Sequence, residues 1–214
     1  MSKSTQAMQI DDSQNPGMLW VKAGEQAWSA CIQCHGKAQD SMRGVAARFP
    51  RIIDKKLLNL SEQINRCRVD RLQLALLGSE SQAILQMTAF IGLQSRDLPI
   101  KPDSDSVTLA ASKRGERLFH QRMGQLDLSC AQCHNARAGM RLGASLIPQG
   151  HPNGYPQYRL EWQTMGSLAR RMRNCMVGIR AEPFVAGSTE WLELEAFLMQ
   201  RAAGMAIETP AVRP

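Results

Sequence analysis

The sequence predicts a mainly α-helical protein built from two tandem domains related by internal duplication. Three observations predict this class. A five-residue cysteine-histidine motif occurs twice, apolar residues recur at three- and four-residue spacing, and few segments alternate as strands do. The 214 residues suffice for two domains of about 100 residues each. Domains of that size have thin cores, and they usually need covalent or cofactor support.

Composition divides the chain into five segments. The stretch from Lys101 to Ser106 is polar, contains Pro102, and is typical of a linker. The expected segments are a flexible tail over 1–16, an N-terminal domain over 17–100, a linker over 101–108, a C-terminal domain over 109–205 and a second tail over 206–214.

In the N-terminal half, Leu19 to Ala30 is expected to form a helix that runs into the first motif. Four further residues are 3, 4 and 3 positions apart and are predicted to share one face of a helix: Leu57, Leu60, Ile64 and Cys67. The turn residues Gly78-Ser79-Glu80 then precede an apolar helical stretch around Ala89–Ile91.

The C-terminal half repeats this order. Val107 to Arg122 is expected to be a helix that runs into the second motif. The span 135–158 is rich in Gly and Pro and is interpreted as a loop that wraps a cofactor or partner. A second helix face is predicted for Trp162, Met165, Leu168, Met172 and Cys175. A last helix over 189–203 has Ser188 or Thr189 available as its N-cap.

The repeated motif is C-x-x-C-H, at Cys31 to His35 and again at Cys130 to His134. Composition alone predicts about 0.003 chance copies of this c-type haem attachment sequence. Two thiols one turn apart reach the two vinyl groups of a porphyrin, and the histidine turns under its plane. A zinc site would need a further ligand pair, and a thioredoxin site would need a βαβ unit.

We therefore predict two cytochrome c-like domains and two covalently bound c-type haems. The predicted attachment residues are Cys31, Cys34, Cys130 and Cys133. The predicted proximal iron ligands are His35 and His134. The free histidines His120 and His151 and the twelve methionines are all candidates for the opposite face of each iron.

One further cysteine follows each motif, Cys67 after 36 residues and Cys175 after 45. The duplication favours these two thiolates as the second iron ligands, and thiolate ligation lowers the reduction potential. Two alternatives stay open, a disulfide between Cys67 and Cys175 or two unreactive buried thiols.

The net charge of +7 and a pI near 9.4 favour anionic partners. We expect no nucleic-acid binding, because no basic stripe alternates with aromatic residues and no zinc-finger spacing occurs. Arginines gather beside the cysteines instead, which points to small anions or cofactor carboxylates. The sequence contains no run of 18 or more apolar residues, so no membrane-spanning helix is predicted.

Residues 1–17 have no apolar core of a secretory signal. Haem attachment to C-x-x-C-H nevertheless takes place outside the cytoplasmic membrane, so a periplasmic location is expected. We therefore interpret Met1 as the start of a processed or engineered chain.

Over residues 18–214 the sequence resembles the SoxA family, the dihaem cytochrome c subunits of SoxAX, which are L-cysteine S-thiosulfotransferases of bacterial sulfur oxidation. The stretches that carry the resemblance are Arg171-Met172-Arg173-Asn174-Cys175, Arg180-Ala181-Glu182-Pro183-Phe184, Gly187-Ser188 and Glu208 to Pro214.

The resemblance implies that Cys67 is the distal ligand of the first haem. It implies that Cys175 is both the distal ligand of the second haem and the active-site sulfur, often found as a persulfide, and that Arg171 binds substrate. The implied partners are SoxX, a small cytochrome c that completes a heterodimer, and SoxYZ, a carrier whose cysteine receives the sulfur. The departure from the family is the missing signal peptide.

Helical spacing supports the role of Arg171, which lies one turn before Cys175 on the same face. Its guanidinium can pair with two sulfonate oxygens and offset the repulsion between dianionic thiosulfate and a thiolate. Arg180 is a second candidate, and for both arginines a haem-propionate salt bridge is the alternative.

The predicted function is oxidative coupling of thiosulfate to a SoxYZ cysteine through Cys175, with two electrons passed to SoxX. A non-catalytic dihaem electron carrier and a tetrathionate-forming thiosulfate dehydrogenase are the alternatives.

Overall fold

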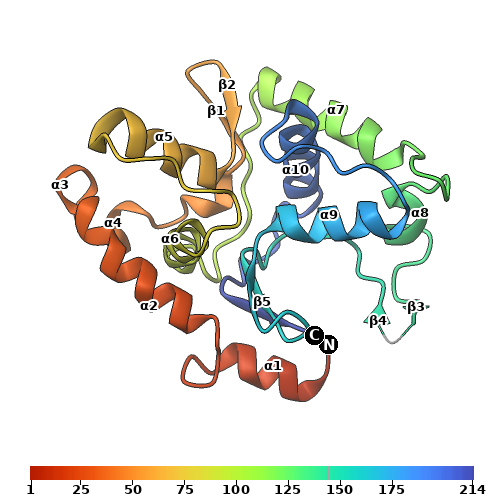
Figure 1. The fold of residues 1–214 in the computed structure, drawn as a ribbon, viewed down its shortest axis with the longest axis horizontal. Helices are drawn as coiled ribbons and strands as arrows, with labels where there is room; N and C mark the ends of the chain where they lie inside the picture. Colours follow the sequence, from red (N-terminus) through yellow and green to blue (C-terminus); the bar gives the residue numbers. More distant parts are fainter. Residues whose placement is uncertain (144) are drawn as a thin grey trace.

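The two halves of the chain form two neighbouring helical units in the computed structural model, which describes residues 1–143 and 145–214 (Figure 1). The predicted mainly α-helical class is confirmed. The elements of the N-terminal half are α1 (Lys3–Ile10), α2 (Met18–Ala27), the 3-10 turn η1 (Trp28–Ala30), α3 (Ile32–His35), α4 (Ala38–Ser41), η2 (Ala46–Arg48), β1 (Arg51–Ile53), β2 (Lys56–Leu58), α5 (Leu60–Leu72) and α6 (Gln82–Leu93).

The C-terminal half begins with the long helix α7. Its elements are α7 (Ser106–His120), α8 (Cys130–His134), β3 (Arg141–Leu142), β4 (Ser145–Leu146), β5 (Gln157–Arg159), β6 (Thr164–Gly166), α9 (Leu168–Gly178), α10 (Thr189–Arg201) and β7 (Ala211–Arg213). The helices predicted over 19–30, 107–122 and 189–203 are therefore present, with ends shifted by a few residues.

The first long helix of each half packs against the last, α2 against α6 and α7 against α10. A glycine lies at each crossing. A Cβ atom on Gly24 would collide with the backbone carbonyl of Gln86, and one on Gly115 would collide with that of Glu193. The same close helix contact thus organises both halves, as expected for a duplicated unit. Apolar side chains around it form the cores, with Val21, Trp28 and Phe90 in one half and Phe119, Leu194 and Leu198 in the other.

Gly115→Ala is expected to destabilise the protein by about 3 kcal/mol, because the added methyl group forces α7 and α10 apart. Thermal unfolding of the holoprotein should then occur at a temperature lower by about 6–12 °C. Gly178→Ala is the matched control, since a Cβ there has no atom within 4 Å. Equal melting temperatures for the two variants would contradict the close crossing.

Two of the predicted helix faces extend too far toward the N-terminus. Leu57 belongs to strand β2, because Asn59 starts α5 with a capping box that includes Glu62. Likewise Met165 belongs to β6, and α9 starts only after Ser167, whose hydroxyl accepts from the Arg170 N–H. Trp162 therefore also lies outside the predicted helix. In both cases the apolar residues at helical spacing begin before the polar N-cap residue, but the helix itself begins only after it.

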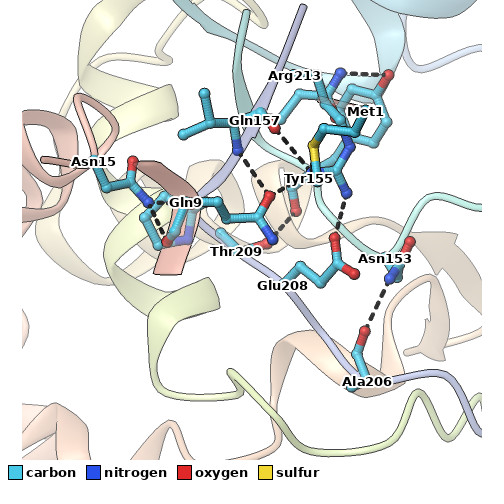
Figure 2. Close-up of polar contacts among 12 residues, drawn as sticks. Met1, Gln9, Asn15, Asn153, Tyr155, Gln157, Ala206, Glu208, Thr209 and Arg213 are labelled. Atoms are coloured by element: carbon cyan, nitrogen blue, oxygen red, sulfur yellow. Dashed lines mark hydrogen bonds and ion pairs between the residues drawn. The ribbon is translucent and has the colours of Figure 1, made fainter. Parts of the chain in front are cut away.

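The two segments predicted as flexible tails are folded. Helix α1 lies beside β7, so the two chain ends meet (Figure 1). Strand β7 pairs in parallel with β5, which also pairs antiparallel with β6. The Asn15 amide donates to the Pro210 carbonyl at 2.8 Å, and Arg213 contacts both Gln9 and Glu208 (Figure 2). Hydrogen bonds from Asn15 and Arg213 therefore connect the two ends of the chain. Such contacts between residues far apart in the sequence cannot be predicted from hydrophobic periodicity.

A cavity of about 380 Å³ lies between the halves, lined by residues of α5 and α6 on one side and of α9 and α10 on the other. The Glu195 carboxyl of α10 lines it and accepts a hydrogen bond from the Asn59 side chain at 3.0 Å. Burial raises the pKa of Glu195 to about 7, the Asn59 hydrogen bond lowers it, and nearby Glu62 raises it further.

Glu195→Gln should therefore change how stability depends on pH. The folded pKa lies above the ordinary value of 4.5, so the native protein loses stability as pH rises from about 4.5 to 7. The variant should lack this loss and be more stable than the parent by up to about 3 kcal/mol at pH 8, with no difference at pH 4. Denaturant unfolding of the holoprotein at both pH values measures this.

Glu190→Gln, at the exposed start of the same helix, is the control and should not stabilise the protein at pH 8. Glu195→Gln behaving like Glu190→Gln at pH 8 would show that burial does not raise the pKa of Glu195.

Candidate functional site

The first C-x-x-C-H motif forms the short helix α3 after the 3-10 turn η1. The Trp28 ring lies 5.7 Å from the His35 ring, and its Nε1–H donates to the Gly36 carbonyl at 3.0 Å. Gly36 has φ +67, which ends the helix directly after the histidine. The imidazole is therefore held against a buried tryptophan at the end of one turn.

Cys67 lies on helix α5, close to the first motif. Burial raises the pKa of the Cys31 thiol, and the neighbouring Cys67 raises it further. The Gln63 amide donates to the Cys67 sulfur at 3.3 Å. Cys31 also packs against the apolar cluster that contains Ile64 of the same helix, so the predicted partner cysteine lies near its own motif.

The second motif forms α8 behind a Ser129 cap, with a capping box that includes Gln132. His134 Nδ1 donates to the Pro148 carbonyl at 2.7 Å, which leaves Nε2 free to bind iron. Burial lowers the pKa of His134, so the imidazole stays neutral as metal binding requires. A Cβ on Gly150 would lie 3.3 Å from the imidazole.

The segment 148–150 thus passes close to His134, within the span predicted to wrap a cofactor. That span is not wholly irregular, because it contains the hairpin β3–β4 and the first two residues of β5.

The surroundings of the second motif fit a haem. Its walls are apolar side chains from α7, α9 and α10 and the loop between the last two. These residues are Phe119, Leu168, Met172, Phe184, Leu194, Phe197 and Leu198. Cys130 packs against this cluster, and apolar surroundings of this kind suit a covalently attached porphyrin.

Cys175 lies at the second motif. Burial raises the pKa of the Cys130 thiol to about 11, and the next largest contribution comes from Cys175. All six cysteines belong to the described residues and are free. The disulfide considered between Cys67 and Cys175 is therefore not formed, and each cysteine stays within its own half.

Arg171 is half-buried on α9, one turn before Cys175. It interacts electrostatically with His134 and with Tyr155. Within residues 1–143 and 145–214, no carboxylate forms an ion pair with it. A half-buried guanidinium without a counter-ion favours a bound anion.

The second arginine candidate, Arg180, is exposed and has φ +58 in the turn after α9. A different arginine approaches the motif. Arg201 stacks on the Phe119 ring at 5.4 Å and interacts with His134. Sequence reasoning missed Arg201, although its spacing of four residues after Phe197 places it on the same helix face.

The family model described as the SoxA/TsdA cytochrome c domain matches residues 16–100 and 114–207. The chain belongs to the SoxA family, because relatives named SoxA are 32% and 34% identical to it over 98% of its length. The double match confirms two tandem cytochrome c-like domains, and cytochrome c domains bind haem covalently.

This SoxA chain is similar along nearly its whole length to relatives that carry the SoxA name. The L-cysteine S-thiosulfotransferase subunit SoxA of Rhodovulum sulfidophilum is 32% identical over 98% of this chain and 76% of the relative. The subunit of the same name from Pseudaminobacter salicylatoxidans is 34% identical over 98% and 77%. The crystal structure of SoxXA from P. pantotrophus matches with a TM-score of 0.96 and 33% identity, covering 100% of this chain and 84% of that chain.

Among the described residues, no helix is both long and apolar enough to cross a bilayer.

Proposed function

We propose that this SoxA chain is a haem-dependent L-cysteine S-thiosulfotransferase that oxidatively couples thiosulfate to the cysteine of a carrier protein. One observation carries the proposal. Arg171 is a half-buried cation without a carboxylate partner among the described residues, and it lies one helical turn from Cys175 at the second motif. The relatives named L-cysteine S-thiosulfotransferase subunit SoxA support the same activity.

Two haems are proposed, one in each half. Cys31 and Cys34 would attach the first, with His35 and Cys67 as its iron ligands. Cys130 and Cys133 would attach the second, with His134 and Cys175 as ligands. When bound, the haem supplies a one-electron acceptor beside the sulfur.

The protein side of the chemistry starts with the anion. Arg171 pairs with two sulfonate oxygens of thiosulfate, which offsets its repulsion from the Cys175 thiolate. Arg201 adds a second positive charge on the side of His134. The sulfane sulfur is then held next to the Cys175 sulfur, and an S–S bond forms between them as two electrons leave.

The transfer step is a thiol–disulfide exchange. The oxidised adduct has the Cys175 Sγ atom bonded to the sulfane sulfur, which in turn carries the SO₃⁻ group. The carrier thiolate attacks that sulfane sulfur, the bond to Sγ breaks, and Cys175 leaves as a thiolate. The balance is one carrier thiolate and one thiosulfate converted to one S-thiosulfonated carrier cysteine and two electrons. The proposed carrier is SoxYZ.

SoxX is the proposed electron acceptor and heterodimer partner, supported by the likeness to the chain solved in SoxXA. A periplasmic location is proposed because haem is attached to C-x-x-C-H on that side of the membrane.

The test is a transfer assay with purified holoprotein, SoxX, oxidant, thiosulfate and SoxYZ. Intact-mass spectrometry of SoxYZ should show addition of one S-SO₃ group to its cysteine. Tetrathionate formed without SoxYZ would instead indicate a thiosulfate dehydrogenase, and reduction of SoxX without any sulfur product would indicate an electron carrier. The mass of the SoxA chain itself counts the attached haems.

A further inference from the structure

Tyr155 lies at the junction between the loop that contacts His134 and the strand β5. Its backbone carbonyl accepts from the Thr209 hydroxyl at 2.9 Å, and its N–H donates to the Pro152 carbonyl at 3.2 Å. Figure 2 shows the side chain beside Gln157 and Arg213. The backbone of Tyr155 is therefore fixed by contacts on both sides.

The pairing of β5 with β6 brings this junction to the start of α9. Gln157 lies opposite Gly166, and Ser167 caps α9 directly after Gly166. Tyr155 and the first residues of α9, Leu168 and Ala169, also line one cavity. Tyr155 thus lies next to the helix that carries Arg171 and Cys175.

The charges around the phenol agree with this position. It interacts with Arg171, Arg159, Cys175 and Arg213. Arg159 forms an ion pair with Glu161, and Arg213 forms one with Glu208. Arg171 is the cation of this group without such a partner among the described residues, so the uncompensated positive charge lies on the side of Cys175.

The Tyr155 hydroxyl accepts one hydrogen bond and is free to donate another. Its oxygen accepts from the Gln157 amide at 3.0 Å. In the described part of the chain, no acceptor takes the hydroxyl proton. Because burial raises the pKa of Tyr155, the hydroxyl stays protonated. Gln157 therefore orients the oxygen and leaves its O–H free to donate.

We propose that the Tyr155 hydroxyl donates a hydrogen bond to a sulfonate oxygen of thiosulfate held between Arg171 and Cys175. This inference rests on the proposed function and adds a substrate-binding residue to it. The phenol supplies the neutral donor and Arg171 the charge, so a tetrahedral oxyanion is favoured over a bare sulfide, which has no oxygen to accept.

The test compares Tyr155→Phe with Tyr158→Phe. Tyr158 packs edge-on against Trp20 at 5.8 Å and is the other tyrosine of the chain, so each variant loses one hydroxyl and keeps the ring. Thiosulfate binding to the oxidised holoprotein, without carrier or SoxX, is measured by calorimetry. The KM and kcat of the complete transfer assay are measured in parallel.

Tyr155→Phe should weaken thiosulfate binding about tenfold and raise KM by a similar factor, since a hydrogen bond to an anion is lost. Tyr158→Phe should match the parent, and both variants should keep the haem spectrum and melting temperature. A dissociation constant for Tyr155→Phe within twofold of the parent, or equal losses in both variants, would overturn the inference.

The binding measurement separates this inference from the proposed function. A parent protein that binds thiosulfate but transfers no sulfur would refute the function, while the comparison of variants still decides the role of Tyr155. A parent that binds no thiosulfate would refute both.

Discussion

Cys175→Ser is expected to abolish sulfur transfer, with turnover falling by more than about a thousandfold. A serine hydroxyl neither forms the S–S bond nor leaves as a stabilised anion in the exchange step. Haem attachment should persist, because the proposed attachment residues Cys130 and Cys133 are untouched. The measurement is the mass of SoxYZ after incubation with thiosulfate, together with the intact mass of the SoxA variant.

Cys67→Ser is the natural comparison, since Cys67 occupies the corresponding position beside the first motif. It should change the electron paramagnetic resonance signal of the first haem, while sulfur transfer by Cys175 remains measurable. Retained turnover in Cys175→Ser would exclude Cys175 as the sulfur carrier and return the chain to the class of simple electron carriers.

Arg171→Gln is expected to lower kcat/KM for thiosulfate about a hundredfold. The substitution keeps a side chain of similar reach and removes the charge that offsets repulsion between thiosulfate and the Cys175 thiolate. The loss should be largest at low ionic strength, because the parent benefits most from attraction when screening is weak. Initial rates at two salt concentrations measure both effects.

Arg173→Gln is the matched control, because Arg173 is exposed on the same helix and carries the same charge. It should retain most of the activity. If Arg171 binds a haem propionate instead, Arg171→Gln would shift the reduction potential of the second haem while leaving the KM for thiosulfate unchanged.

Local sequence signals predicted the helices that begin at a cap and carry a regular apolar face. The last helix is an example, because Ser188 caps it and its apolar positions continue to Met199. The same reasoning failed where apolar spacing crossed a cap, at Leu57 and Met165. Spacing is a property of neighbours along the chain, whereas a cap acts through one hydrogen bond to the backbone.

The chain ends were misread for a related reason. Residues 1–16 and 206–214 have little periodicity, yet Asn15 and Arg213 tie them to each other through hydrogen bonds over about 200 positions. Hydrogen bonds between residues so far apart produce no local sequence pattern. The polar composition of the two segments therefore predicted flexible tails.

Local sequence patterns identify the available chemistry: two C-x-x-C-H motifs, one further cysteine in each half, and an arginine one turn before Cys175. Such patterns are readable because the reacting atoms are close along the chain. Only the tertiary structure brought Pro148, Arg201 and Tyr155 to His134 and α9, since these residues come from separate loops and helices that meet through packing. Residues that orient or recognise a substrate are selected by distance in space, and that distance exists only once the chain has folded.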